Sequence, residues 1–416
     1  MNDTVGTVSL AHCNTSNGTQ VGSNGNISSD PLFVMGYYLA SGSPSRDAGT
    51  GASPLLSGNY TTSASGEADS APVDMGYHYS SAADMSVATL YVAVDGSDLN
   101  GGTALESPLR SLTAALAKAR HGTFIHMGSG HYPFGVESFP IMIKGMSGVT
   151  IEGAADGRSV IDATGANTRV VELYGVSGGA FRNLDFTGGY CNLGSGLEER
   201  AGGVAVTASS VAFTQCNFSN NYLRTQTALG SGLSIDSGSV VAVTRCLVAS
   251  NTVVSRQGNW PSQGAGVYNA GTLTMSECVL AGNNNDVNNT ANRGGGLYNT
   301  GSALLRNCLL AGNRATTQGG GIHNGGGTLV LQSGTVVNNY KEGLNRAAGS
   351  VSATNTLFWA NTSDIVGSVT LGYCNTESGI DAGVNGNMSV DPQFSPKVGK
   401  AYHLDRDSPL VNAGVA

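Results

Sequence analysis

The feature that most constrains the fold is a short phrase that recurs through the second half of the chain. Its copies are centred on Cys216, Cys246, Cys278 and Cys308, with Gly334 and Thr356 in the same place in two further copies. Five residues after each centre stands an asparagine, and the six are Asn221, Asn251, Asn283, Asn313, Asn339 and Asn361. The copies are 30, 32, 30, 26 and 22 residues apart. Such a variable spacing predicts stacked units whose joining loops differ in length.

The residue types indicate that these units are built from strands. Glycine, valine, threonine and asparagine disfavour helix, and apolar residues alternate locally, as Leu273 and Met275 do around Thr274. Stacked strands lie about 4.8 Å apart, so an inward asparagine can hydrogen-bond its equivalent in the next unit. A second row ends the phrases GAGVYN, GGGLYN and GGGIHN, at Asn269, Asn299 and Asn324. We therefore predict an all-β fold, a right-handed parallel β-helix solenoid with two asparagine ladders.

A helix is expected near the start of this solenoid. Ser111 precedes the segment LTAALAKAR and is a suitable N-cap, and Leu112, Ala115 and Leu116 fall on one face. The end of a solenoid exposes core residues and strand edges, which a helix can cover. The sequence therefore predicts an N-terminal capping helix.

A longer internal match sets the expected domain organisation. Residues 2–33 match residues 363–394 at a constant offset of 361. We predict that residues 1–84 are the terminal coil and closing segment of a preceding unit. Residues 89–416 are then a second unit, with a cap at 89–125, coils at 126–394 and a truncated closing segment at 395–416. The alternative is a complete subunit whose similar ends let copies stack end to end.

Composition excludes several classes of partner. The net charge is −8 and only 12% of the residues are charged, so the basic stripe of a nucleic-acid-binding protein is not expected. No apolar run approaches the 18 residues that a transmembrane helix needs. The hydrophobic share of 40% allows a packed core.

The repeated cysteines favour a core position over a metal site. They occur once per copy, without C-x-x-C pairs or clustered histidines, so a zinc site is disfavoured. Stacked cysteines lie close to disulfide distance, but their Cβ atoms would be slightly too far apart. We expect small buried side chains and no bound metal.

Catalytic and calcium-binding candidates are sparse. Arg182, Asp185 and Glu198 form the richest charged group and could share a groove, although a solvated turn is the favoured interpretation of the loop that contains Glu198. The segment DGSDLNG offers Asp95, Asp98 and Asn100 as calcium ligands, but an Asx-rich turn is an equal alternative.

Aromatic residues supply a candidate binding surface. In the three glycine-rich phrases the flanking residues should point inward, so Tyr268, Tyr298 and His323 are expected to form an exposed stack, with Trp260 in the longest insertion beside it. Stacked aromatics suit sugar rings. Ordinary cross-strand packing is the alternative.

The repeated phrases also resemble a known family. FSNN at residues 218–221 and LAGN at 310–313, alternating with GGGLYN and GGGIHN, resemble the repeats of polymorphic outer-membrane proteins, which are β-helical surface adhesins. Residues 90–394 look like the pectin-lyase-like β-helix superfamily. Residues 30–79 are similar to the closing segment of β-helix proteins with a variable surface anchor. The resemblance implies an extracellular or cell-surface location.

These observations together favour a structural role. We predict a secreted or cell-surface adhesive module, one unit of a tandem-repeat adhesin or surface fibre, that binds a glycan or a neighbouring surface protein. A polysaccharide lyase or glycoside hydrolase and a self-assembling extracellular filament are the alternatives. The scarcity of aligned carboxylates disfavours the enzyme. No cofactor is expected, apart from calcium as an alternative.

Overall fold

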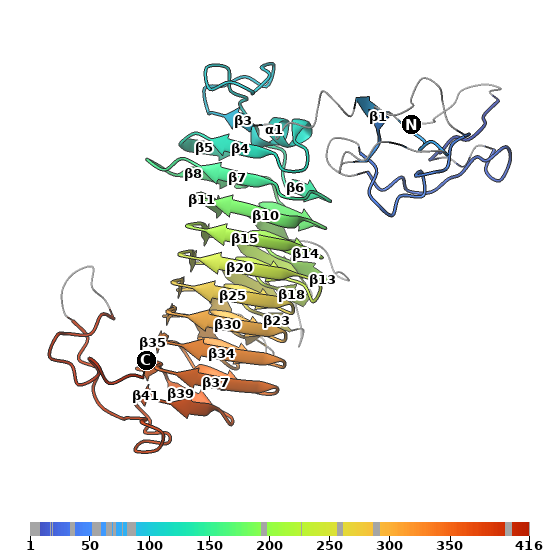
Figure 1. The fold of residues 1–416 in the computed structure, drawn as a ribbon. Helices are drawn as coiled ribbons and strands as arrows, with labels where there is room; N and C mark the ends of the chain where they lie inside the picture. The colour runs from blue at the N-terminus through green and yellow to red at the C-terminus, as the bar shows by residue number, and fades with distance from the viewer. Residues whose placement is uncertain are drawn as a thin grey trace. The chain divides into compact units, whose positions relative to one another are not determined.

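The computed structural model describes residues 9–415, except for residues 17, 19, 34–37, 52–59, 64–68, 70, 71, 77, 81–88, 193–197, 226, 256–260, 286–291 and 396–401. The chain forms two units (Figure 1). The first contains residues 1–126 and 143–150, and the second contains residues 127–142 and 151–416.

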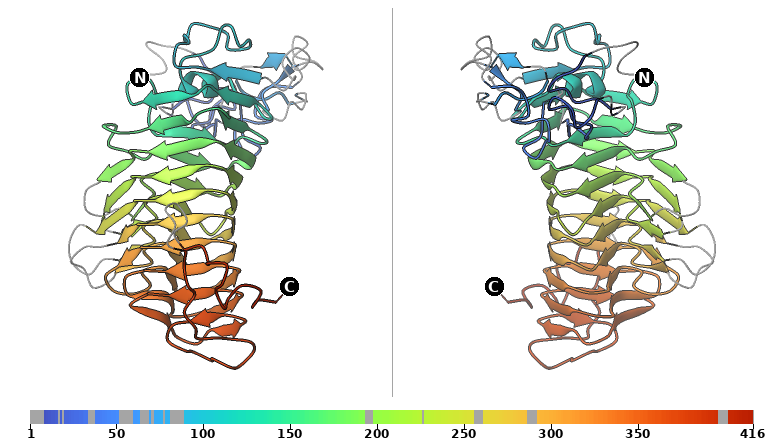
Figure 2. Two further views of the ribbon diagram at one scale, coloured as in Figure 1. Left: turned by 90° about the vertical axis from the view of Figure 1, so that its left-hand side faces the viewer. Right: turned by 90° about the vertical axis from the view of Figure 1, so that its right-hand side faces the viewer.

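Parallel strands stacked in three long sheets build the second unit, and Figure 2 shows them as successive rungs. Sheet 1 runs through β7 (Thr150–Gly153), β10 (Ser177–Arg182), β15 (Ser210–Thr214), β20 (Val240–Thr244), β25 (Thr272–Ser276), β30 (Ser302–Arg306), β34 (Thr328–Gln332), β37 (Ser350–Thr354) and β40 (Thr370–Gly372). Sheet 2 runs through β5 (Gly130–Pro133), β8 (Ser159–Asp162), β11 (Leu184–Thr187), β16 (Asn217–Ser219), β21 (Leu247–Ala249), β26 (Val279–Ala281), β31 (Leu309–Ala311), β35 (Thr335–Val337), β38 (Leu357–Trp359) and β41 (Asn375–Thr376). Sheet 3 runs through β6 (Ile141–Lys144), β9 (Val171–Tyr174), β14 (Val204–Thr207), β19 (Leu233–Ile235), β24 (Val267–Asn269), β29 (Leu297–Asn299), β33 (Ile322–Asn324), β36 (Glu342–Arg346) and β39 (Ser363–Val366).

Sheets 4 and 5 are shorter and lie in the chain between sheet 2 and sheet 3. Sheet 4 contains β12 (Tyr190–Asn192), β17 (Tyr222–Thr225), β22 (Thr252–Ser255), β27 (Asn284–Asn285) and β32 (Arg314–Ala315). Sheet 5 contains β13 (Glu198–Arg200), β18 (Thr227–Leu229), β23 (Ser262–Gln263) and β28 (Asn292–Arg293). The sequence placed these insertions in turns, whereas the structure pairs them into sheets. A second small core lies among them, formed by Cys191, Leu223, Ala228, Val253 and Ala265.

The side chains that point inward build a continuous core. Inward and outward residues alternate along each strand of sheet 1, and equivalent inward residues stack from coil to coil. Phe181 lies 5.0 Å from Phe213, and Phe186 lies 5.3 Å from Phe218, between ring centroids. The predicted parallel β-helix is confirmed.

The corner before each core cysteine is a single residue in the left-handed conformation. Gln215, Arg245, Glu277 and Asn307 have φ of 55°, 54°, 56° and 48°. Each directs the next residue inward, so that Cys216, Cys246, Cys278 and Cys308 are buried free thiols. The predicted core position of these four cysteines is confirmed.

Both asparagine ladders are present. Along the first, each side-chain amide donates to the Oδ1 of the next asparagine, at 3.1, 2.9, 2.9, 3.1 and 3.0 Å from Asn221 to Asn361. In the second, Asn269 donates to Asn299 at 2.8 Å, and Asn299 donates to Asn324 at 2.7 Å. The ladders satisfy polar groups that the corners would otherwise leave buried without partners.

The first unit contains the predicted helix, α1 (Leu112–Lys118). Ser111 is its N-cap and accepts a hydrogen bond from the Ala114 amide at 3.0 Å, while Leu112, Ala115 and Leu116 are buried. The unit also holds β3 (Thr89–Val92), which pairs with β4 (Phe124–Met127), and the antiparallel pair β1 (Tyr60–Thr61) and β2 (Tyr79–Ser80). Among the described residues, no helix has the length and hydropathy needed to cross a membrane.

Candidate functional site

The predicted aromatic stack exists, but most of it is not exposed. Tyr268 and Tyr298 stack with ring centroids 5.7 Å apart, and Tyr298 and His323 stack at 5.1 Å. Tyr298 is only 6% exposed and His323 only 1%. The expectation of an exposed stack is therefore wrong for these two residues. Trp260, expected beside them, lies outside the described residues.

Sheet 5 explains this burial. Gln263 of β23 donates a hydrogen bond to the Tyr298 hydroxyl at 3.1 Å, which places sheet 5 against the outer side of sheet 3. Burial raises the pKa of Tyr298. Burial, together with the charge of Arg293, lowers the pKa of His323 to about 4. The stack is therefore a packing element between two sheets.

A different row of side chains faces outward from sheet 4. The paired strands bring one residue from each into line: Tyr190, Tyr222, Thr252, Asn284 and Arg314. The last four directly follow the ladder asparagines Asn221, Asn251, Asn283 and Asn313. We call this line the sheet 4 row. All five of its side chains are half-buried. The row was not predicted from the sequence, although four of its five members can be recognised there as the residues directly after a ladder asparagine.

The chemistry of the sheet 4 row is aromatic at one end and cationic at the other. The rings of Tyr190 and Tyr222 stack at 5.0 Å with an interplanar angle of 11°. Arg314 lies over the ring of Tyr340, 4.0 Å from its centroid. In the part of the chain that the structure describes, Asn284 Oδ1 has no hydrogen-bond partner. The row thus offers hydroxyl, amide and guanidinium groups along one direction.

Ionisable residues meet on the outer side of sheet 2, on or directly before the neighbouring strands β5, β8 and β11. His131 Nε2 lies 2.7 Å from Asp162 Oδ2, and Arg158 forms an ion pair with Asp185. Burial alone would raise the pKa of Asp162, but hydrogen bonds from Thr164 and His131 outweigh it and lower that pKa. The hydrogen bond to Asp185 raises the pKa of Arg158. We call these two pairs the sheet 2 cluster.

The three predicted catalytic candidates belong to three different sheets. Arg182 ends β10 of sheet 1, Asp185 lies on β11 of sheet 2, and Glu198 begins β13 of sheet 5. Asp185 is instead paired with Arg158. The side chain of Glu198 lies outside the described residues. Of the residues in the sheet 2 cluster, only Asp185 was predicted from the sequence.

The proposed calcium loop has the contacts of an Asx-rich turn. Asp98 accepts hydrogen bonds from the amides of Arg110 and Ser111, both at 2.9 Å, and from the Ser111 hydroxyl at 2.9 Å. Asn100 donates to the Pro108 carbonyl at 2.8 Å. Asp98 thus tethers the residue that caps α1. Asp95 is exposed.

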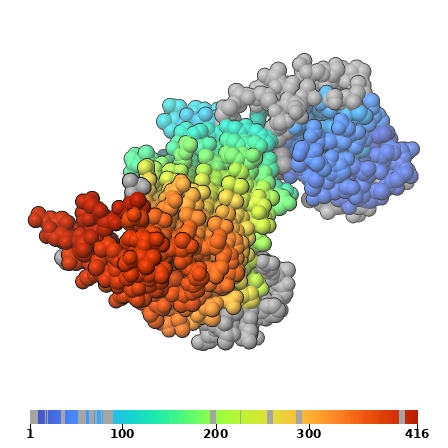
Figure 3. Space-filling view, turned by 60° about the horizontal axis from the view of Figure 1, so that its bottom comes forward, coloured from blue at the N-terminus to red at the C-terminus, as the bar shows by residue number. Residues whose placement is uncertain are grey.

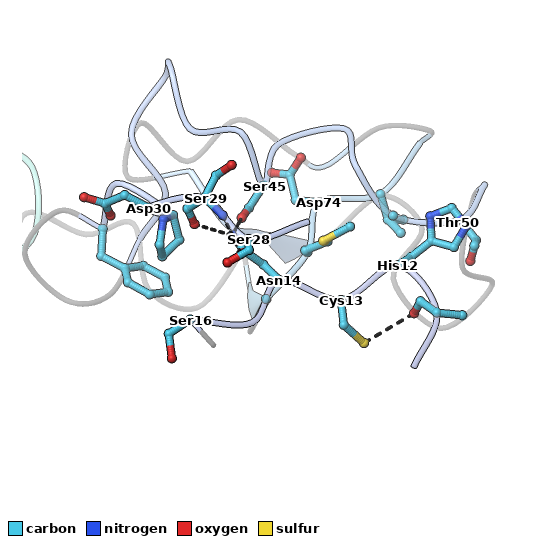
Figure 4. A pocket seen from close by; sticks show the side chains of 17 residues that line it. His12, Cys13, Asn14, Ser16, Ser28, Ser29, Asp30, Ser45, Thr50 and Asp74 are labelled. Atoms are coloured by element: carbon cyan, nitrogen blue, oxygen red, sulfur yellow. Dashed lines mark hydrogen bonds between the residues drawn. The ribbon is translucent and has the colours of Figure 1, made fainter. Parts of the chain in front are cut away.

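The first unit contains a pocket of about 850 Å³ (Figure 4). His12, Cys13, Asn14, Ser45 and Asp74 are among the residues that line it. Figure 4 shows the hydrogen bond from the Cys13 thiol to the Ala11 carbonyl, which measures 3.4 Å.

A group of carboxylates lies close to this pocket. Ligand atoms of Asp47, Asp69 and Asp74 lie within 4.8 Å of one another, so a cation would fit their chemistry. Asp69 also lies 2.6 Å from His78, and Asp74 accepts from the Asp47 amide at 2.6 Å.

Comparisons with known proteins support the fold. No family model and no curated protein matches the chain. The crystal structure of pectate lyase Pel9A is similar with a TM-score of 0.52 and 16% sequence identity, over 79% of this chain and 91% of that one. A rhamnogalacturonan lyase structure is similar with a TM-score of 0.39 and 12% identity, over 74% of this chain and 90% of that one. The fold is that of pectate lyase-like β-helix proteins.

Proposed function

We propose that the chain is an extracellular β-helix module with a structural and adhesive role, which binds a glycan along the sheet 4 row. The observation that carries the proposal is the alignment of Tyr190, Tyr222, Thr252, Asn284 and Arg314 on successive strands. Successive strands lie about 4.8 Å apart. A polymer with a short chemical repeat can therefore make a similar contact on each strand.

The groups in the row suit sugars. Tyrosines give amphipathic contact area at a low cost in conformational entropy. Hydroxyl, amide and guanidinium groups supply donors and acceptors for sugar hydroxyls. The similar fold of pectate lyase Pel9A supports a polysaccharide as the partner.

Affinity electrophoresis in gels that contain individual neutral and acidic polysaccharides tests the proposal. We expect at least one polysaccharide to retard the protein, and the substitutions Tyr222→Ala and Arg314→Ala to weaken the retardation about tenfold each, as losses of roughly 1.4 kcal/mol. Thr274→Ala is the matched control, since Thr274 is a half-buried outward residue of sheet 1. Retardation that is unchanged in both row variants would exclude the sheet 4 row as the binding site.

The sheet 2 cluster favours a second candidate, a polysaccharide lyase or hydrolase. Asp162 holds His131 in place, and the lowered pKa keeps Asp162 ionised at neutral pH, so the imidazole is oriented to accept or donate a proton. Arg158 adds a positive charge next to Asp185.

Product analysis separates the enzyme from the binding module. The purified chain would be incubated with acidic polysaccharides and assayed for unsaturated products and new reducing ends. If the cluster is catalytic, Asp162→Asn and Asp185→Asn abolish turnover, whereas Glu277→Gln, on an exposed corner, leaves it unchanged. The adhesive proposal predicts no turnover by any of these proteins.

A further inference from the structure

Two segments of the chain fold in the same way. We call residues 9–50 the N-terminal copy and residues 370–415 the C-terminal copy. The Cys13 amide donates to Asn26 Oδ1 at 2.9 Å, and the Cys374 amide donates to Asn387 Oδ1 at 2.9 Å. The left-handed residues also correspond, with φ of 50° at Asn24 and 51° at Asn385. The internal match in the sequence is therefore a match in local structure.

Further contacts extend this equivalence along both copies. The side chain of Asn14 donates to the Ser29 carbonyl at 2.9 Å, as Asn375 does to the Val390 carbonyl at 3.0 Å. A parallel bridge joins Asn14 to Ile27 and another joins Asn375 to Met388. Later in each copy, antiparallel bridges join Phe33 to Leu39 and Phe394 to Leu404. Any surface that binds one copy should accordingly suit the other.

The C-terminal copy is seated on the last coils of the solenoid. Asn375 of β41 is the register partner of Leu357 in β38, and its amide donates to the Thr356 carbonyl at 3.0 Å. Further along the copy, the side chain of Asn355 bonds both the amide and the carbonyl of Val415, at 2.9 and 2.8 Å. Figure 3 shows the C-terminal copy in red against these coils.

The equivalent face of the N-terminal copy lines the pocket in Figure 4. Cys13 is half-buried, whereas its equivalent Cys374 is 1% exposed. The backbone N–H of Asn14 has no acceptor among the described residues. The equivalent backbone N–H of Asn375 donates to the Thr356 carbonyl. Gly49 and Thr50 also line this pocket, and Thr50 corresponds to Val415, which bonds Asn355 in the C-terminal copy. The N-terminal copy thus presents the face with which its twin binds a coil.

We propose that the N-terminal copy binds the last coils, β37 and β38, of a second copy of this chain. There it takes the place of that chain's own C-terminal copy. Because both copies have equivalent local structure, the exchange replaces each lost contact with a similar one, as in domain swapping. Asn14 would then pair with Leu357 of the neighbouring molecule, as Asn375 does within one molecule. The contact joins two different surfaces, so it builds an open head-to-tail assembly.

A matched pair of substitutions tests this proposal on the full-length chain. Asn387→Ala removes the acceptor of the Cys374 amide and weakens the C-terminal copy, so it frees the coil that a neighbour needs. Asn26→Ala makes the same change in the N-terminal copy and weakens the segment that binds. We expect Asn387→Ala to raise the association constant about fivefold, and Asn26→Ala to lower it by a similar factor. Sedimentation velocity over a concentration series measures both constants.

The opposite signs of the two effects distinguish exchange from non-specific aggregation. Aggregation of a destabilised protein would increase in both variants, and that result would overturn the proposal. Strictly monomeric behaviour of the wild type and of both variants at high concentration would also overturn it. Circular dichroism before each run checks that the β-helix is folded. Alkylation of Cys13 is a second measurement, because exchange buries this thiol as Cys374 is buried, and assembled fractions should be labelled more slowly than monomers.

Discussion

At the scale of single residues, the hydrogen bonds of the first ladder explain why all six copies of the repeat have an asparagine at the same position. Asn283 accepts from the amide and the side chain of Asn251, and it donates to Val248 and Asn313. A buried side chain that makes four such bonds needs both a donor and an acceptor, at a short reach from the corner. Aspartate lacks the donor, and serine offers a single rotating hydroxyl.

We predict that Asn283→Ala lowers stability much more than Asn361→Ala. The first substitution removes the acceptor of the Asn251 backbone N–H and of one Asn251 side-chain N–H, together with a donor to the Val248 carbonyl, which costs roughly 3–5 kcal/mol in the free energy of unfolding. Asn361 is less buried and stands at the end of the ladder, so its loss should cost about 1–2 kcal/mol. Urea unfolding followed by circular dichroism compares the two. Equal losses would show that the ladder does not act as a buried network.

A second prediction at this scale concerns pH. The pKa of His323 in the folded chain is about 4, below the ordinary value of 6.5, so protonation favours the unfolded state. The contribution of the neutral His323 side chain to the free energy of unfolding is fully present above pH 6.5 and is lost as the pH falls from 6.5 to about 4. The loss should reach about 3 kcal/mol.

The variant His323→Phe isolates this effect. Phenylalanine keeps an aromatic ring next to Tyr298 but cannot titrate. The difference in unfolding free energy between the wild type and His323→Phe should therefore change between pH 7 and pH 4. A difference that is constant over this range would show that His323 titrates normally in the folded chain.

At the scale of elements, the corners determine how the strands are placed. After sheet 2 the chain forms sheets 4 and 5, and it returns to sheet 3 through glycines packed against backbone. A Cβ on Gly296 would lie 2.6 Å from the Gly321 carbonyl oxygen, and one on Gly266 would lie 2.5 Å from the Gly296 oxygen. This return brings sheet 5 against Tyr298 and explains why the predicted exposed stack is buried.

Glycine substitutions test this account of the corners. We predict that Gly296→Ala destabilises the fold by more than 2 kcal/mol, because neighbouring backbone must move to admit the methyl group. The matched control is Gly312→Ala. Gly312 has a φ of 62° and nothing within 4 Å of an added Cβ, and Ala360 occupies the equivalent corner with a φ of 52°. The control should cost only about 1–2 kcal/mol, the strain of a left-handed alanine. A lower thermal unfolding midpoint for Gly312→Ala than for Gly296→Ala would contradict this explanation of the corners.

The same elements show which structural features could be predicted from the sequence. The ladders, the buried cysteines and the cap at Ser111 were predictable because each depends on a local rule or on a regular spacing. The burial of Tyr298 was not, since it depends on where β23 returns in space. The sheet 2 cluster was only partly foreseen, because His131 and Asp162 are far apart in sequence and meet only through the register of β5 and β8.

At the scale of the whole molecule, each coil of the second unit pairs with its immediate neighbours through hydrogen-bonded parallel strands. In such arrays, stability is close to a sum over units and their interfaces. Equivalent groups of the N-terminal and C-terminal copies differ in how far they are buried. Cys13 and Cys374 are an instance, because the first is half-buried and the second is buried.

Cysteine reactivity is therefore a measure of stacking across the molecule. The chain has seven cysteines, of which Cys13 is half-buried and the other six are buried free thiols. Burial raises the pKa of Cys374, which further slows its reaction as a thiolate. We predict that one thiol per native monomer reacts rapidly with an alkylating reagent and that all seven react in urea. Mass spectrometry of the digested protein locates the label, and the Cys13→Ser variant, which should show no rapid phase, is the control. Rapid labelling of Cys246 or Cys278 in the native protein would mean that the coils open far more readily than their continuous hydrogen bonding predicts.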